Sequence, residues 1–165
     1  MISGAPSRPP EIQVAFLPNA VRSLHGQAVV LIDVIRTSTT VVDCFSQGAR
    51  AVYLSSSLEA ARSPRAPIDD PMILAEVVGG EARPGATLAP SPSLLRQHPP
   101  TGRNVVICTV NGAAAAERLL GSGASSILLV GLVNLEASVQ RLLDTAGERA
   151  ITVVCALRKP TRSPS

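Results

Sequence analysis

The residues best suited to chemistry directly follow the most apolar segment of the sequence. Ala28–Ile35 has the sequence AVVLIDVI, and Arg36 and four hydroxyl residues come next. Unpaired N–H groups in the first turn of a helix attract anions, and arginine and hydroxyl groups add donors suited to phosphate or sulfonate. A helix cap alone would account for only one hydroxyl. We therefore expect an anion-binding turn built from Arg36 with Thr37, Ser38, Thr39 and Thr40.

Asp33 is the one charged residue inside that apolar segment. A buried carboxylate is costly unless it is paired with a cation or bound to a metal. Magnesium typically takes one or two protein carboxylates together with oxygens of the substrate. Asp33 is therefore predicted to be a Mg²⁺ ligand, and the alternative is a structural ion pair with Arg36.

Short polar residues follow three other apolar runs, in Gly79–Arg83, Thr109–Gly112 and Gly131–Asn134. Ligands of open parallel sheets bind beyond the carboxyl ends of the strands. Taken singly, each of these segments is equally consistent with an ordinary turn or helix cap. Taken together, they predict a polar pocket at one edge of a sheet, lined by Glu81, Arg83, Thr109, Asn111, Gly112 and Asn134.

The elements that must position these residues alternate along the chain. The predicted strands are Ile12–Leu17, Ala28–Ile35, Ala51–Leu54, Met72–Val77, Asn104–Thr109, Ile127–Val130 and Ile151–Cys155. The predicted helices are Ser38–Gln47, Ser57–Arg62, Ser91–Gln97, Gly112–Leu120 and Leu135–Ala146, with Gly48, Gly121 and Gly147 at their ends. The apolar strands suit burial on both faces, so the pattern predicts an α/β fold of three α/β/α layers with a mostly parallel central sheet.

The chain of 165 residues has the length of one domain. We expect a disordered Pro/Ser-rich tail over 1–10, an α/β domain over 11–156 and an irregular tail over 157–165, with a loop over Ser63–Pro71. The last predicted strand is followed directly by LRKPTRSPS. This end is either an ordinary frayed terminus or the sign of a C-terminally truncated protein.

Composition excludes several classes of function. Only 2% of residues are aromatic, which disfavours base stacking, and the arginines behind the net charge of +3 are scattered, so no nucleic-acid partner is expected. No apolar run approaches the ~20 residues of a membrane span, so no membrane partner is expected. Cys44, Cys108 and Cys155 lie far apart and are predicted to be buried thiols, which indicates the reducing cytoplasm. His25 and His98 are expected to be exposed loop residues.

Taken in order, these segments resemble the motifs of the 2-phosphosulfolactate phosphatase family. Asp33–Thr40 (DVIRTSTT) is similar to the family's DVxRATTT, and Thr109–Gly112 (TVNG) is similar to its TTNG. Weaker matches are Gln47–Ala49, Gly79–Glu81 (like GGER), Ser91–Pro92 (like NSP), and Asn134 with Ala137. The resemblance covers the chain to about Ala156 and implies Mg²⁺-dependent hydrolysis of (2R)-2-phospho-3-sulfolactate to 3-sulfolactate and phosphate, a step of coenzyme M biosynthesis.

The resemblance also implies roles for particular residues. Asp33, Arg36 and Glu81 would be catalytic, and Asp33 and Glu81 would bind the metal. The substrate, a small anionic phosphate monoester, would be held by Thr37, Ser38, Thr39, Thr40, Arg83, Thr109, Asn111, Gly112 and Asn134. An activated water and a phospho-aspartyl intermediate on Asp33 both remain open as the nucleophile.

The sequence departs from the family pattern at a few positions. Ala82 stands where the family has Arg, and Pro90 stands where it has Asn. The family also continues further, so we expect a C-terminally truncated member, and an exposed sheet edge left by truncation would favour a homodimer. The alternative function is a non-catalytic α/β module that binds small anions.

Overall fold

The computed structural model describes residues 10–63, 68–77 and 79–157. The chain divides into two compact units. The first holds the residues up to Asp33, Ala115–Val130 and the residues from Asn134 onward, and the second holds Val34–Ala114 and Gly131–Val133. Most of both predicted tails, and part of the Ser63–Pro71 loop, lie outside the described residues. The single domain over 11–156 stays a prediction.

The predicted strands are present and pair in parallel. The first unit has the sheet order β1-β7-β2-β6, and the second has β3-β5-β4. The strands are β1 Ile12–Ala15, β2 Ala28–Ile32, β3 Ala51–Ser55, β4 Met72–Leu74, β5 Asn104–Cys108, β6 Ile127–Val130 and β7 Ile151–Cys155. Four of them are shorter than predicted: β2 ends before Asp33 and β4 ends before Glu76, while β1 ends two residues early and β5 one residue early.

The predicted helices are present as well. They are α1 Thr39–Ser46, α2 Leu58–Ala61, α3 Pro92–Gln97, α4 Val110–Gly121 and α5 Leu135–Ala146. Shorter turns are the 3-10 segments η1 Pro18–Ala20 and η3 Leu132–Asn134 and the π-type turn η2 Val34–Ser38. Gly48 follows α1 with φ +83°, a conformation that glycine adopts without strain. Gly121 is instead the last residue of α4, and Gly123 supplies the positive φ beyond it.

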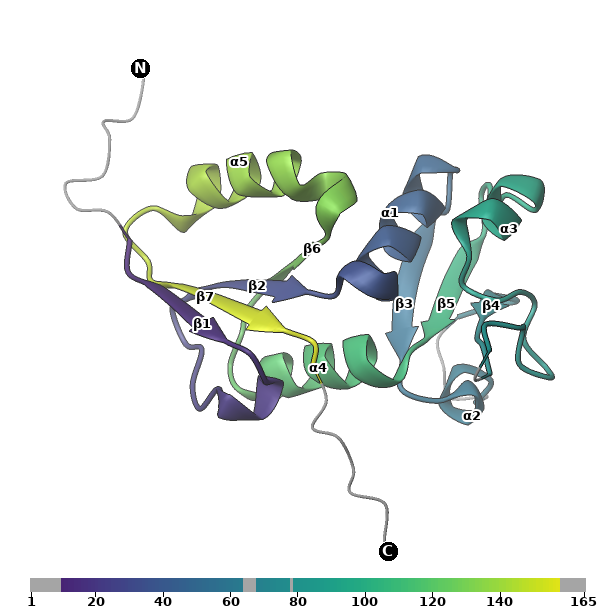
Figure 1. Ribbon diagram of the computed structural model, residues 1–165, viewed down its shortest axis with the longest axis horizontal. Helices are drawn as coiled ribbons and strands as arrows, with labels where there is room; N and C mark the ends of the chain where they lie inside the picture. Colours follow the sequence, from purple (N-terminus) through teal and green to yellow (C-terminus); the bar gives the residue numbers. More distant parts are fainter. Residues whose placement is uncertain (1–9, 64–67, 78, 158–165) are drawn as a thin grey trace, which may run out of the picture. The chain divides into compact units, whose positions relative to one another are not determined.

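Alternation along β2 builds the layers of the first unit. Val29 and Leu31 pack on one face with Leu119 of α4, whereas Val30 packs on the other face with Ala146 of α5. Successive side chains of a strand point to opposite faces, so one apolar strand serves both helices. Figure 1 shows the sheet between α4 and α5.

The second unit repeats this layering on a smaller scale. Val105 and Ile107 of β5 are buried with Cys44 of α1 and Leu95 of α3. On the opposite side of the sheet, α2 packs against β3 and β5, and its Ala61 is buried (Figure 1). The expected α/β/α layers with parallel strands are therefore confirmed, and the strands form one sheet in each unit.

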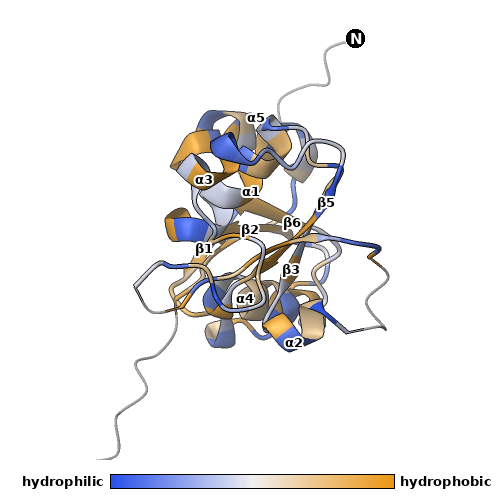
Figure 2. Ribbon diagram, turned by 90° about the vertical axis from the view of Figure 1, so that its right-hand side faces the viewer, coloured by the Kyte–Doolittle hydropathy of each residue, from blue (hydrophilic) through white to orange (hydrophobic). Residues whose placement is uncertain are grey.

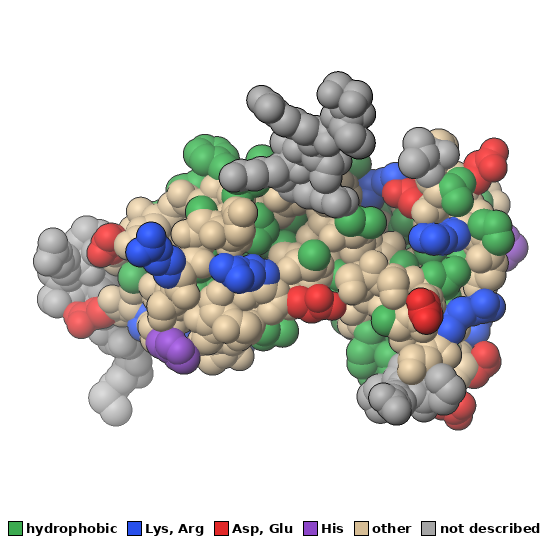
Figure 3. Space-filling model, turned by 90° about the horizontal axis from the view of Figure 1, so that it is seen from below, with side chains coloured by type: hydrophobic (Ala, Val, Ile, Leu, Met, Phe, Trp, Pro, Cys, Tyr) green, Lys and Arg blue, Asp and Glu red, His purple; other side chains and the backbone are tan. Residues whose placement is uncertain are grey.

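Hydropathy follows the layers. Figure 2 colours the strands as predominantly hydrophobic, while helices such as α2 carry both hydrophobic and hydrophilic residues. On the face drawn in Figure 3, the basic side chains lie in small separate groups, as the scattered arginines indicate.

No helix within the described residues has both the length and the apolar character needed to cross a membrane. Cys44 is buried as predicted, whereas Cys108 and Cys155 are only partly buried.

Candidate functional site

A group of polar side chains in the second unit gathers around Arg36. After β2 the chain passes through η2, where the peptide bond between Ile35 and Arg36 is cis, and then enters α1. The side chain of Arg36 is 43% exposed and forms an ion pair with Glu76. Glu76 lies two residues beyond the end of β4. The predicted anion-binding arginine therefore already has a carboxylate partner.

The second oxygen of Glu76 is unusual. Its Oε2 atom is buried and has no hydrogen-bond partner among the residues that the structure describes. A buried polar atom without a partner typically costs about 1–3 kcal/mol, so such atoms are rare in folded proteins. One oxygen of Glu76 thus holds Arg36, while the other is left for a ligand.

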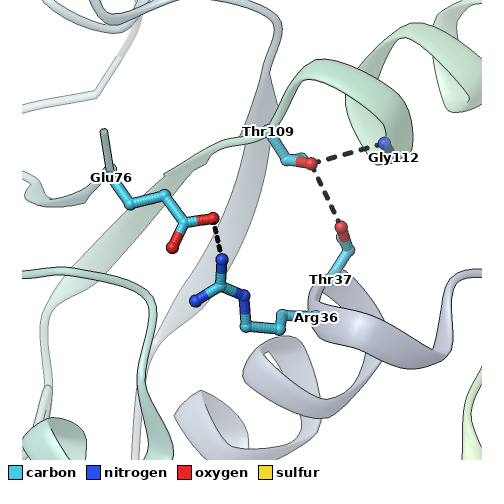
Figure 4. A network of polar contacts seen from close by, with 5 residues as sticks. All are labelled: Arg36, Thr37, Glu76, Thr109 and Gly112. Atoms are coloured by element: carbon cyan, nitrogen blue, oxygen red, sulfur yellow. Dashed lines mark hydrogen bonds and ion pairs between the residues drawn. The ribbon is translucent and has the colours of Figure 1, made fainter. Parts of the chain in front are cut away.

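Thr37 and Thr109 form the second contact of the site. Their hydroxyl oxygens lie 3.3 Å apart, and the Gly112 N–H donates to the Thr109 hydroxyl over 3.4 Å (Figure 4). Thr109 directly precedes α4 and acts as its N-cap. Because the Thr109 oxygen accepts from Gly112, its O–H is free to donate. Both hydrogen bonds are longer than the usual distance.

The remaining hydroxyls of the predicted turn differ in role. Thr39 donates its hydroxyl to the Val34 carbonyl over 3.1 Å, which ties it to the backbone. Ser38 and Thr40 are fully buried. The Thr40 hydroxyl has no hydrogen-bond partner within the described part of the chain. The structure therefore brings Arg36 and Thr37 to the site and places Thr40 inside α1.

The glycine-rich segment forms a tight hairpin beside Arg36. Glu76 and Ala82 form an antiparallel bridge, and the Val77 N–H donates to the Glu81 carbonyl. A Cβ atom on Gly80 would lie 3.9 Å from Nη1 of Arg36, so the hairpin lies close to the guanidinium. Glu81 is exposed, and its metal-binding and catalytic role stays a prediction.

The other predicted residues are spread over both units. Arg83 and Asn111 are exposed in the second unit, and Asn111 lies in the first turn of α4. Asn134, in the first unit, donates its side-chain amide to the Leu129 carbonyl at the end of β6. Asp33, also in the first unit, is buried directly after β2. Within the described residues, no three His, Cys, Asp or Glu side chains form a cluster able to hold a metal ion.

Sequence reasoning missed Glu76. The predicted strand Met72–Val77 extends over Glu76 and so places it inside a strand. The signal was nevertheless available, because Glu76 ends the apolar run MILA just as Asp33 follows AVVLI. An acidic residue at the carboxyl end of an apolar strand is a stronger indication than one within a glycine-rich turn.

Comparison with protein-family models matches residues 16–162 to the family of 2-phosphosulpholactate phosphatase. This match begins directly after β1 and covers the other strands together with every site residue described above. The chain belongs to the 2-phosphosulpholactate phosphatase family. The predicted resemblance is therefore confirmed at the level of the family.

Individual members of this family are also similar to the chain. The chain is 36% identical over 145 residues to a probable 2-phosphosulfolactate phosphatase of Deinococcus radiodurans, covering 88% of this chain and 58% of the relative. It is 34% identical to one of Thermus thermophilus, covering 80% and 54%, and 33% identical to one of a Synechococcus species, covering 82% and 55%. The chain thus spans somewhat more than half the length of these family members.

Proposed function

We propose that the protein hydrolyses (2R)-2-phospho-3-sulfolactate to 3-sulfolactate and phosphate in a Mg²⁺-dependent reaction. The observation that carries the proposal is the site in the second unit, where the Arg36–Glu76 ion pair and the Thr37–Thr109 contact lie at the ends of β4 and β5. Family membership and the names of the relatives support the same reaction.

Each residue of the site has a part in this proposal. Arg36 offers a planar guanidinium that suits a phosphate oxygen, and Glu76 fixes its orientation. The hydroxyls of Thr37 and Thr109 donate to the same anion. Donors fixed before the reaction stabilise the charge that develops in the transition state, which is the main need in phosphoryl transfer.

One carboxylate oxygen of the site suits a magnesium ion. The buried Oε2 of Glu76, without a partner among the described residues, is the kind of hard oxygen ligand that Mg²⁺ prefers. A bound Mg²⁺ would supply Lewis-acid stabilisation of the phosphoryl oxygens. Asp33 and Glu81 keep the ligand roles that the family resemblance implies. Either an activated water or Asp33 itself serves as the nucleophile.

The setting of the reaction follows the family resemblance. We place it as a step of coenzyme M-type biosynthesis in the cytoplasm, and the three free thiols support a reducing compartment. A homodimer stays a prediction.

The decisive assay measures phosphate release from racemic 2-phospho-3-sulfolactate by the full chain. We expect release that requires Mg²⁺ and stops with EDTA. Asp33→Asn should abolish this release without lowering the melting temperature, whereas a purely structural Asp33 would lower stability and leave turnover. Calorimetric binding of sulfolactate without any phosphate release would instead identify a non-catalytic anion-binding module and would contradict the proposal.

A further inference from the structure

A pair of arginines lines a groove in the second unit. The groove has a volume of about 740 Å³, and Arg62 and Arg83 lie on its wall with Ser57, Glu59 and Ser63. Ser57 follows β3 and caps α2, so the groove lies at the carboxyl end of that strand. Ligands of parallel sheets bind at this end.

The charge of this groove is positive. Among the described residues, neither Arg62 nor Arg83 forms an ion pair, although the carboxylate of Glu59 lines the same groove. Arg36, by contrast, is matched by Glu76. The two guanidinium groups of the groove therefore remain available to an oxyanion, which they bind through several N–H donors each.

Gly85 holds Arg62 in position. A Cβ atom on Gly85 would lie 2.9 Å from Nη1 and 3.2 Å from Cζ of Arg62, so the guanidinium packs directly against the glycine backbone. Gly85 also has φ +89°, where other residues are strained. The close approach depends on the missing side chain and restricts where the Arg62 charge can lie.

A hydrogen bond joins the lining of the groove to the residue that precedes Thr109 of the site already described. The Cys108 thiol donates to the Ser57 carbonyl over 3.6 Å, and Cys108 directly precedes Thr109. Burial raises the pKa of Cys108, and the nearby Arg83 cation lowers it in part. Arg83 therefore lies near Cys108 at the end of β5, and Cys108 adjoins Thr109 in the sequence.

We infer that Arg62 and Arg83 bind the sulfonate of the substrate, an oxyanion separate from the phosphate that Arg36 and the two threonines hold. The identity of this ligand rests on the proposed function. The charge of the Arg36 guanidinium is already balanced by Glu76. A substrate with several anionic groups therefore needs a further cationic group. The groove supplies the second cationic position within the same unit.

Calorimetric titration tests this assignment without requiring turnover. The probes are 3-sulfolactate, lactate, which has the same carbon chain without the sulfonate, and inorganic phosphate. We expect Arg62→Ala and Arg83→Ala each to weaken sulfolactate binding about tenfold and to leave lactate binding unchanged, as expected for loss of one charged hydrogen-bonding group. Arg96→Ala, which removes an exposed arginine of α3, is the matched control and should bind sulfolactate like the wild type.

Two glycine variants distinguish the effect of displacing the Arg62 side chain from the effect of backbone strain alone. Gly85→Ala should displace the Arg62 guanidinium and weaken sulfolactate binding to a similar degree. Gly102→Ala has a similar positive φ of +72° but no atom within 4 Å of its new Cβ, so it should retain binding. Circular dichroism and thermal melting confirm that each variant is folded.

The outcomes distinguish this inference from the proposed function. Weaker sulfolactate binding in both arginine variants supports the groove even if no phosphate is released, in which case only the phosphatase proposal fails. Equal sulfolactate affinity in wild type, Arg62→Ala and Arg83→Ala overturns the inference even if turnover is observed. Equal losses for phosphate and sulfolactate also overturn it, because the groove would then bind any free oxyanion rather than the sulfonate.

Discussion

Single atoms carry most of the chemistry at the residue scale. Glu76 uses one oxygen to hold Arg36 and buries the other without a partner among the described residues. Thr109 accepts from the backbone of α4 and still has a proton to give to Thr37 or to a ligand. The buried Glu76 oxygen costs stability, and a cation that coordinates it would offset this cost.

The Thr109 hydroxyl offers a direct test of this view. Thr109→Val keeps the shape of the side chain but removes the cap of α4 and the donor to an anion. We expect stability to fall by about 1 kcal/mol, the usual value of a helix cap. Phosphate release should fall more, by about 10²-fold, as for loss of one transition-state donor.

Thr101→Val is the matched control, because the Thr101 hydroxyl donates only to the Gln47 carbonyl at the surface. It should change stability slightly and leave the rate of phosphate release unchanged. Equal losses of rate in both threonine variants would show that Thr109 acts only on stability.

Cys44 makes the stability of the protein depend on alkaline pH. Burial, and then the neighbouring Asp43 charge, raises the pKa of Cys44 from 9.0 to about 12. Between these values the unfolded thiol loses its proton while the folded thiol keeps it, so the unfolded state binds fewer protons and stability falls as pH rises. The slope is about 1.4 kcal/mol per pH unit for one such proton.

We therefore expect the free energy of unfolding, measured in urea, to decrease more steeply from pH 9 to 10.5 in the wild type than in Cys44→Ala. Cys155→Ala, which removes a partly buried thiol, is the comparison and should retain the wild-type slope. A slope that is the same in all three proteins would contradict the effect of burial on Cys44.

At the element scale, short helices depend on single apolar anchors. α3 has six residues, and its Leu95 is fully buried against Val105 and Ile107 of β5. Leu95→Ala should lower the free energy of unfolding by about 2–5 kcal/mol through the lost contacts and the cavity left behind. Leu120→Ala, on an exposed position of α4, should change it by about 0.5 kcal/mol or less. If chemical denaturation gave the same loss in free energy of unfolding for Leu95→Ala and Leu120→Ala, Leu95 would not belong to the core.

Elements with strong apolar runs were predictable from the sequence. β6 and β7 and the helix α5 have the predicted bounds, because β-branched runs and amphipathic spacing define them locally. The ends of strands were less predictable. Ile35 continues the apolar run after β2 but is 83% exposed, because the chain leaves the sheet after Ile32 and turns through η2.

The same limit applies to the site. Arg36 and Thr37 were found because hydroxyl residues beside arginine are locally recognisable. Their partners were not, because Glu76 is 40 residues from Arg36 along the chain and no local pattern joins them. Tertiary pairing, rather than residue type, distinguishes Glu76 from the exposed Glu81.

At the scale of the whole molecule, the arginines, ion pair and threonines discussed here belong to one compact unit. The chain spans between 54% and 58% of the relatives compared above. A site made of local contacts between η2 and the residues that follow β4 and β5 can be tested in the chain as it is.

The most direct measurement compares the rate of phosphate release from 2-phospho-3-sulfolactate, at saturating Mg²⁺, for the full-chain wild type, Glu76→Gln and Glu117→Gln. Glu117 lies exposed on α4 and serves as the charge-matched control. We predict a loss of about 10²-fold or more for Glu76→Gln and no change for Glu117→Gln, since Glu76, unlike Glu117, orients Arg36 and offers a buried oxygen to the metal. Wild-type rates in the Glu76→Gln protein would contradict the account.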